Sequence, residues 1–104
     1  MITLSIRYTL DASKLADFAA YAKDLQSAIE RCGGQLQGYY LPTKLAGATN
    51  IGLALIDFPS LAAYEAYRGK LLADPGGSAC LRRAEQAGCI LVEDRSFLQR
   101  VTPD

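Results

Sequence analysis

A small set of polar residues in this chain of 104 residues could bind a ligand through charge or hydrogen bonds. They are Ser5, Arg7, Gln37, Tyr39, Asn50 and Arg95. An arginine can anchor an anion or a carbonyl group, and Arg7 is the most suggestive of the set. Tyr39 could donate a hydrogen bond to a ligand or an oxyanion, and Asn50 could polarise a ligand carbonyl. The sequence therefore predicts a binding site of few polar groups rather than a catalytic motif.

Four of these residues also have a structural alternative. Arg7 could form an ion pair with Glu93 or Asp94, since buried arginines are normally paired. Tyr39 could lie at a subunit contact, where one end of a tyrosine is apolar and the other polar. Asn50 fits a turn, and Arg95 fits an ion pair. The structural alternative is favoured for all four.

The chain has no histidine, and this absence restricts its chemistry. It removes Ser-His-Asp and Cys-His catalysis, histidine ligation of haem and most catalytic zinc sites. A general base would have to be Glu93, Asp57, Asp94 or a tyrosinate, and no pair of these stands out by its spacing. The three cysteines are far apart in the sequence, and we interpret Cys32, Cys80 and Cys89 as small buried apolar residues. We therefore expect no metal, haem or other cofactor.

Composition limits the partners of the chain. Half of the residues are hydrophobic, and 11 basic residues balance 11 acidic ones. A chain without net charge or a basic stripe does not point to nucleic acid or to an anionic membrane surface. The first residues have no basic stretch followed by an apolar one, and no apolar run is long enough to cross a bilayer. We expect one domain over residues 1–104 in a soluble, cytoplasmic protein.

The elements that must position the candidate residues follow from apolar spacing and from caps. Strict alternation predicts a strand over residues 2–9, and a stripe from Leu15 to Cys32 predicts a helix that Gly33-Gly34 ends. Ser60 can cap a second helix, and Asp74-Pro75 can begin a short third one that Gly88 ends. The remaining strands are predicted at residues 35–42, 50–58 and 89–98.

This order predicts an α+β fold, a ferredoxin-like βαββαβ sandwich with an extra short helix and a four-stranded antiparallel sheet. The helices cover one face, and the first and third strands are central. The first strand would turn its polar residues, including Ser5 and Arg7, to the open face. Because the third strand is apolar on both sides, the open face would expose an apolar patch, and the simplest partner is a second copy. Two such sheets would form a dimeric α/β barrel with a mostly apolar cavity.

Two further placements follow from alternation along the strands. Tyr39 should share a face with Gln35 and Gln37 and look into the cavity. Arg95 should share a face with Glu93 and Phe97. These placements assign the candidate residues to the cavity walls.

The chain resembles the NIPSNAP family of the dimeric α/β-barrel superfamily. The resemblance is carried, in order, by Ile6-Arg7-Tyr8, Lys14-Leu15-Ala16-Asp17-Phe18, Gly38-Tyr39-Tyr40-Leu41-Pro42, Asn50-Ile51, Phe58-Pro59-Ser60-Leu61-Ala62-Ala63-Tyr64-Glu65-Ala66-Tyr67, Asp74-Pro75 and Arg95-Ser96-Phe97. It implies a ferredoxin-like protomer, a homodimer and an undefined activity. One departure is that Leu36 and Gln37 stand where close relatives tend to have histidines, so histidine chemistry does not transfer to this chain.

Three functions compete at this point. The favoured one is a homodimer that binds a small apolar or aromatic ligand in the barrel cavity. The second is a cofactor-independent monooxygenase or a cyclase or isomerase that acts on an aromatic or polyketide-like substrate. The third is a protein-interaction module that uses the outer helices.

Overall fold

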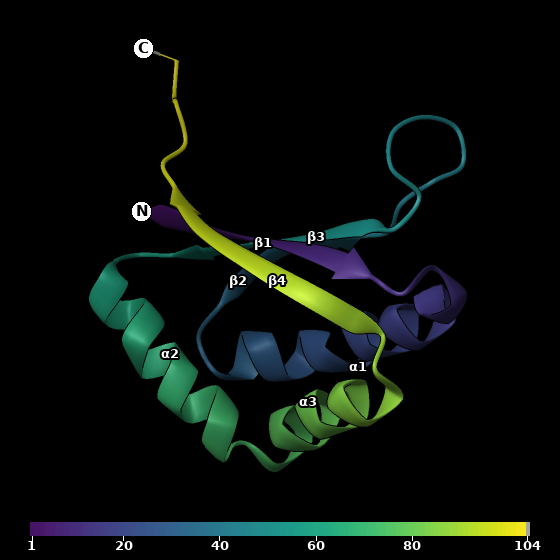
Figure 1. The fold of residues 1–104 in the computed structure, drawn as a ribbon. Coiled ribbons are helices and arrows are strands. Elements are labelled where there is room, and N and C mark those ends of the chain that lie inside the picture. The colour runs from purple at the N-terminus through teal and green to yellow at the C-terminus, as the bar shows by residue number, and fades with distance from the viewer. Residues whose placement is uncertain (104) are drawn as a thin grey trace.

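The computed structural model describes residues 1–103, and its elements follow the predicted order (Figure 1). They are β1 (Ile2–Leu10), η1 (Ala12–Lys14), α1 (Leu15–Arg31), β2 (Gln35–Tyr40), β3 (Ile51–Phe58), α2 (Leu61–Ala73), α3 (Pro75–Ala87) and β4 (Ile90–Leu98). The strands form one antiparallel sheet in the order β2-β3-β1-β4, so β1 and β3 are central as predicted. Figure 1 shows all three helices on one side of this sheet. The ferredoxin-like fold is confirmed.

Alternation along the central strands separates the two faces of the sheet. In β1, Leu4, Ile6 and Tyr8 are buried against the helices, whereas Ser5 and Arg7 lie on the open face. Strand β3 places its buried apolar residues on the helix side too, and its open face carries partly exposed leucines and an isoleucine together with the buried Asp57. The core lies between this side of the sheet and the helices, and its largest fully buried side chains include Phe18, Ile29, Ile56 and Phe58.

Strand β2 departs from simple alternation at one residue. Leu36 pairs with Ile56 and Gly38 pairs with Leu55, so Gln37 is an extra residue between them. A bulge of this kind reverses the face of every residue that follows. Tyr39 pairs with Ala54 and packs against the core on the helix side. The prediction that Tyr39 shares a face with Gln35 and Gln37 is therefore wrong.

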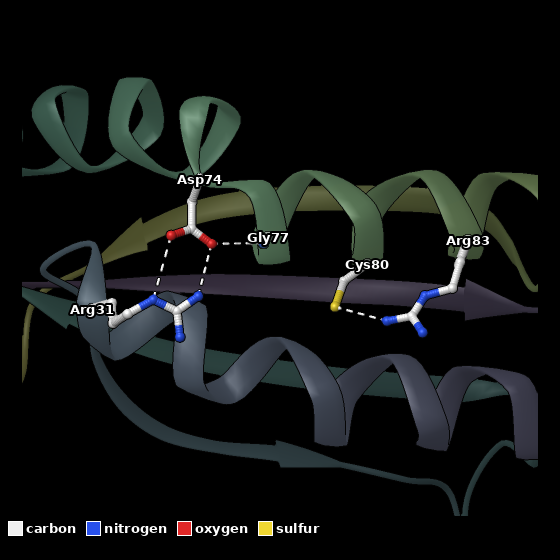
Figure 2. A network of polar contacts seen from close by, with 5 residues as sticks. All are labelled: Arg31, Asp74, Gly77, Cys80 and Arg83. Atoms are coloured by element: carbon white, nitrogen blue, oxygen red, sulfur yellow. Dashed lines mark hydrogen bonds and ion pairs between the residues drawn. The ribbon is translucent and has the colours of Figure 1, made fainter.

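The corner between α2 and α3 is fixed by a single side chain, Asp74 (Figure 2). Its Oδ2 accepts a hydrogen bond from the backbone N–H of Gly77 at 2.8 Å, which caps α3. The same carboxylate accepts two hydrogen bonds from Arg31, at 2.8 and 3.3 Å, in the last turn of α1. With this cap, and with Gly88 after its last residue, the extra helix α3 has 13 residues and begins and ends where the sequence predicts.

Two further observations concern the state of the cysteines and the composition of the helices. Cys32, Cys80 and Cys89 are buried and unbridged, as the sequence predicts. Among residues 1–103, none of the helices has both the length and the apolar composition needed to cross a membrane.

Candidate functional site

The helices leave the inner side of β4, an edge strand of the sheet, partly uncovered. On that side Glu93, Arg95 and Phe97 stand opposite the buried residues Tyr8, Ile6 and Leu4 of β1. Phe97 remains 45% exposed, although its ring lies 5.0 Å from that of Tyr64 in α2. This half-covered strip brings charged side chains next to the protein interior.

Two hollows lie along the strip. A cleft of about 400 Å³ lies between the second half of α3 and the first half of β4. A cavity of about 30 Å³ lies deeper, between the sheet and all three helices. Both are lined by Tyr21 and Leu81, so the cleft continues toward the cavity. We call the cleft, the cavity and the inner side of β4 the β4 trough.

Phenol groups line the deep part of the trough. The hydroxyls of Tyr8 and Tyr39 are 3.5 Å apart, and the ring of Tyr21 meets the ring of Tyr39 edge-on at 6.3 Å. Burial raises the pKa of Tyr8, Tyr21 and Tyr39, and it raises the pKa of Tyr67 to about 12. These phenols are therefore protonated near neutral pH, where they act as hydrogen-bond donors and not as tyrosinate bases.

Two arginines line the same cavity, Arg95 from β4 and Arg68 from α2. Arg95 donates to Glu93 Oε2 at 3.2 Å and to the hydroxyl of Tyr64 at 3.4 Å, so the predicted ion pair is present. Burial is the largest influence on Arg95 and lowers its pKa, but the charge and hydrogen bond of Glu93 together with the nearby hydroxyls of Tyr64 and Tyr8 outweigh it, so the net pKa is raised. Arg68 is half-buried, and no carboxylate of residues 1–103 lies within 4.0 Å of its guanidinium.

Three of the candidate residues from the sequence lie on the open face instead. Ser5 is half-buried between Leu55 and Ser96 of the neighbouring strands. Arg7 is exposed beside Asp94, its register partner in β4, and among residues 1–103 it forms no ion pair with any carboxylate. The sheet separates Ser5, Arg7 and Gln37 from Tyr39 and Arg95.

A buried carboxylate explains the position of Gln37. Its side-chain amide donates to Asp57 Oδ2 at 2.7 Å, and Thr3 donates to Oδ1 at 2.6 Å. Arg100 approaches the same carboxylate at 3.6 Å. Both oxygens of Asp57 are already engaged, which makes this residue a structural anchor and a poor candidate for a general base.

Asn50 lies away from both groups, in the turn that precedes β3. Its side-chain amide donates to the carbonyl of Leu10 at 3.4 Å, and its own carbonyl accepts from the Leu10 N–H at 2.8 Å. These bonds connect the end of β1 to the start of β3. They agree with the turn role that the sequence favours.

Comparison with known proteins places the chain in a family. The sequence model of NIPSNAP matches residues 4–103. The chain belongs to the NIPSNAP family. A comparison with curated proteins gave no match.

Solved structures agree with this assignment. The protein Atu4242 of Agrobacterium tumefaciens is similar with a TM-score of 0.84 and 20% identity, over 97% of this chain and 94% of that one. An uncharacterized NIPSNAP domain protein of Burkholderia xenovorans has a TM-score of 0.80 and 22% identity over the whole of both chains. SnoaB, a cofactor-independent oxygenase of Streptomyces nogalater, has a TM-score of 0.67 and 14% identity over 98% and 94%. At these identities the likeness shows a shared fold.

Sequence reasoning missed four residues of the trough in this NIPSNAP chain. They are Tyr8, Tyr21, Tyr67 and Arg68. Tyr8 lies on the apolar side of β1, which the sequence assigns to the helix side, although not as a site residue. Tyr21 lies three residues after Phe18 in α1 and could have been assigned to the same side. Their meeting with Arg68 and Arg95 depends on how α2 lies against β4, for which no local pattern exists.

Proposed function

We propose that this NIPSNAP protein is a homodimer that binds a small apolar or aromatic ligand in the β4 trough. The observation that carries the proposal is the cleft of about 400 Å³, which shares Tyr21 and Leu81 with the neighbouring phenol-lined cavity. Ligand sites are commonly clefts of roughly 300–1,000 Å³ with apolar walls and a few convergent polar groups. The proposal places the ligand on the helix side and not between two sheets, because the hollow that leads inward lies there.

The homodimer rests on the other face of the sheet. Ile51, Leu53 and Leu55 follow one another along the central strand β3 on the side that no helix covers, and each is partly exposed. Tyr40 from β2 and Leu98 from β4 add exposed apolar surface on that side, at 48% and 51%. An uncovered apolar strip across a whole sheet supports burial against a second copy.

The ligand site is tested with the neutral fluorescent probe N-phenyl-1-naphthylamine, excited directly. We expect the wild-type protein to bind the probe and to enhance its fluorescence. Leu81→Trp fills the place where the cleft meets the cavity and should weaken binding by about 10-fold or more. The matched control is Leu45→Trp, because Leu45 is 92% exposed in the loop between β2 and β3.

Two results would contradict the ligand site. One is a wild-type protein that leaves the fluorescence of the probe unchanged. The other is a Leu81→Trp variant that binds as well as Leu45→Trp while remaining folded by circular dichroism.

A second candidate is an oxygenase that works without a cofactor, as SnoaB does. Its support in this chain is the group of protonated phenols, which could donate to a developing oxyanion. The base would then be Glu93, which lines the cleft beside Tyr21. Oxygen uptake with an oxidisable polycyclic phenol, and its loss in Glu93→Gln, would distinguish this candidate from binding alone.

A further inference from the structure

The rim of the inner cavity differs in chemistry from its interior. The interior is made of apolar side chains and phenols from the core. The rim is made of the less buried lining residues other than Tyr39, which are Arg68, Leu72, Leu81 and Arg95. Two of these carry guanidinium groups, one from α2 and one from β4.

Charge is not balanced at this rim. Glu93 is paired with Arg95 at 3.2 Å, and no other ion pair within residues 1–103 involves either rim arginine. The α2 end of the trough therefore carries two positive charges against one negative charge. At the α3 end the cleft is lined by Glu85, which forms no ion pair within residues 1–103, and by Glu93, which is already paired with Arg95.

Given the proposed binding function, on which this step rests, we infer that the ligand is an apolar acid, such as an aromatic carboxylate. Its anionic oxygens lie between Arg68 and Arg95, and its ring lies among the phenols beyond them. Arginine is suited to this role, because its planar fork matches a carboxylate with two parallel hydrogen bonds. The acidic α3 end of the trough repels the same group and so fixes the orientation of the ligand.

The size of the cavity requires the rim to open for such a ligand. A volume of about 30 Å³ holds one or two waters, whereas an aromatic ring needs roughly 150 Å³. Helix α2 is suited to move, because it buries only Tyr67 and Leu71, while α1 buries six residues. Asp74 holds the far end of α2 through Arg31 (Figure 2), so the outward shift is a rotation about that corner.

The inference is tested with 2-naphthoate and its neutral analogue 2-naphthamide, by isothermal titration calorimetry of the 104-residue chain near neutral pH. We expect the carboxylate to bind at least about 10-fold more tightly than the amide, the size of a charge-assisted hydrogen bond. The double variant Arg68→Gln, Arg95→Gln should lose this preference and keep its affinity for the amide. Arg82→Gln is the control, because Arg82 is an exposed arginine on α3 that does not line the cavity.

The outcomes separate the two proposals. Equal binding of acid and amide, with both displaced by N-phenyl-1-naphthylamine, overturns the inference and leaves the proposed function standing. Failure of all three aromatic compounds to bind overturns both. A preference for the acid that survives in the folded double variant also overturns the inference, because another group must then bind the carboxylate.

Discussion

The two faces of the sheet are built from alternating residues of the same strands, yet they differ in how their chemistry is used. On the helix side, phenols and two arginines gather where the cover of α2 and α3 over β4 ends. On the open side, the buried carboxylate of Asp57 is bound by Thr3, Gln37 and Arg100, and its neighbours in β3 are apolar. Polar groups that still face a cavity favour a ligand, whereas satisfied polar groups among exposed leucines favour a protein surface.

The largest expected effect contrasts two adjacent residues of β3. Ile56 is 1% exposed on the helix side, and Ile56→Ala should lower the free energy of unfolding by about 2–5 kcal/mol through lost burial and a cavity. Leu55 is half-exposed on the open face, and Leu55→Ala in a single chain should cost less than about 1 kcal/mol. Urea denaturation of both variants measures the difference.

The loss of unfolding free energy in the two variants should also differ in its dependence on protein concentration. The loss in Ile56→Ala should be the same over a roughly 100-fold range of concentration, since it arises within one chain. The loss in Leu55→Ala should grow with concentration if the open face is covered by a second copy. Equal losses for the two variants at every concentration would show that the two faces are buried alike.

The next effect concerns the open face alone. We expect the wild-type protein to scatter light at twice the mass of one chain at micromolar concentration. Leu53→Asp puts a charge at the centre of the apolar strip on both copies, and should weaken association by more than about 100-fold, or roughly 3 kcal/mol. Lys44→Asp in the exposed loop after β2 is the control. A monomeric wild-type protein, or a Leu53→Asp variant that remains dimeric, would rule out this surface.

The sequence was sufficient for the order of the elements and for the faces of β1 and β3. The alternation of Leu4, Ile6 and Tyr8 with polar residues places one side of β1 in the core. Apolar residues on both sides of β3 mark it as central. These patterns lie within single strands, and the tertiary structure buries the same faces that they predict.

The positions of Tyr39 and Arg95 show where local patterns are insufficient. Alternation through Gln37 puts Tyr39 on the open face, and a single bulge places it on the helix side. Arg95 shares a face with Glu93 and Phe97 as predicted, but this is the helix side and not the open face that would line the predicted barrel cavity. Its hydrogen-bond partner Tyr64 comes from α2, 31 residues away. A bulge and the angle of a helix are decided by tertiary packing, so the candidate site could be foreseen only in part.

The smallest predicted effect uses Tyr39 and Tyr40, which are neighbours in β2 on opposite faces. Burial raises the pKa of Tyr39 above its ordinary value of about 10, so its folded state resists ionisation more than the unfolded chain does. The resulting stability is fully present below about pH 10 and is lost as the pH rises above that value, because the unfolded chain then releases the proton first. Between about pH 9 and pH 11, Tyr39→Phe should therefore lose about 1 kcal/mol less of its unfolding free energy than the wild-type protein.

Tyr40→Phe provides the comparison, because Tyr40 is 48% exposed on the open face and its ring covers Gly38. We expect this variant to follow the wild-type dependence on pH, measured by urea denaturation at each pH. Tyr8 and Tyr21 are also buried and lower the stability of every variant at high pH. Because the Tyr8 hydroxyl lies 3.5 Å from that of Tyr39, the difference between the two phenylalanine variants reports Tyr39 together with this contact. Identical pH dependence in Tyr39→Phe and Tyr40→Phe would mean that the Tyr39 hydroxyl reaches water, and that the bulge at Gln37 does not place it in the interior.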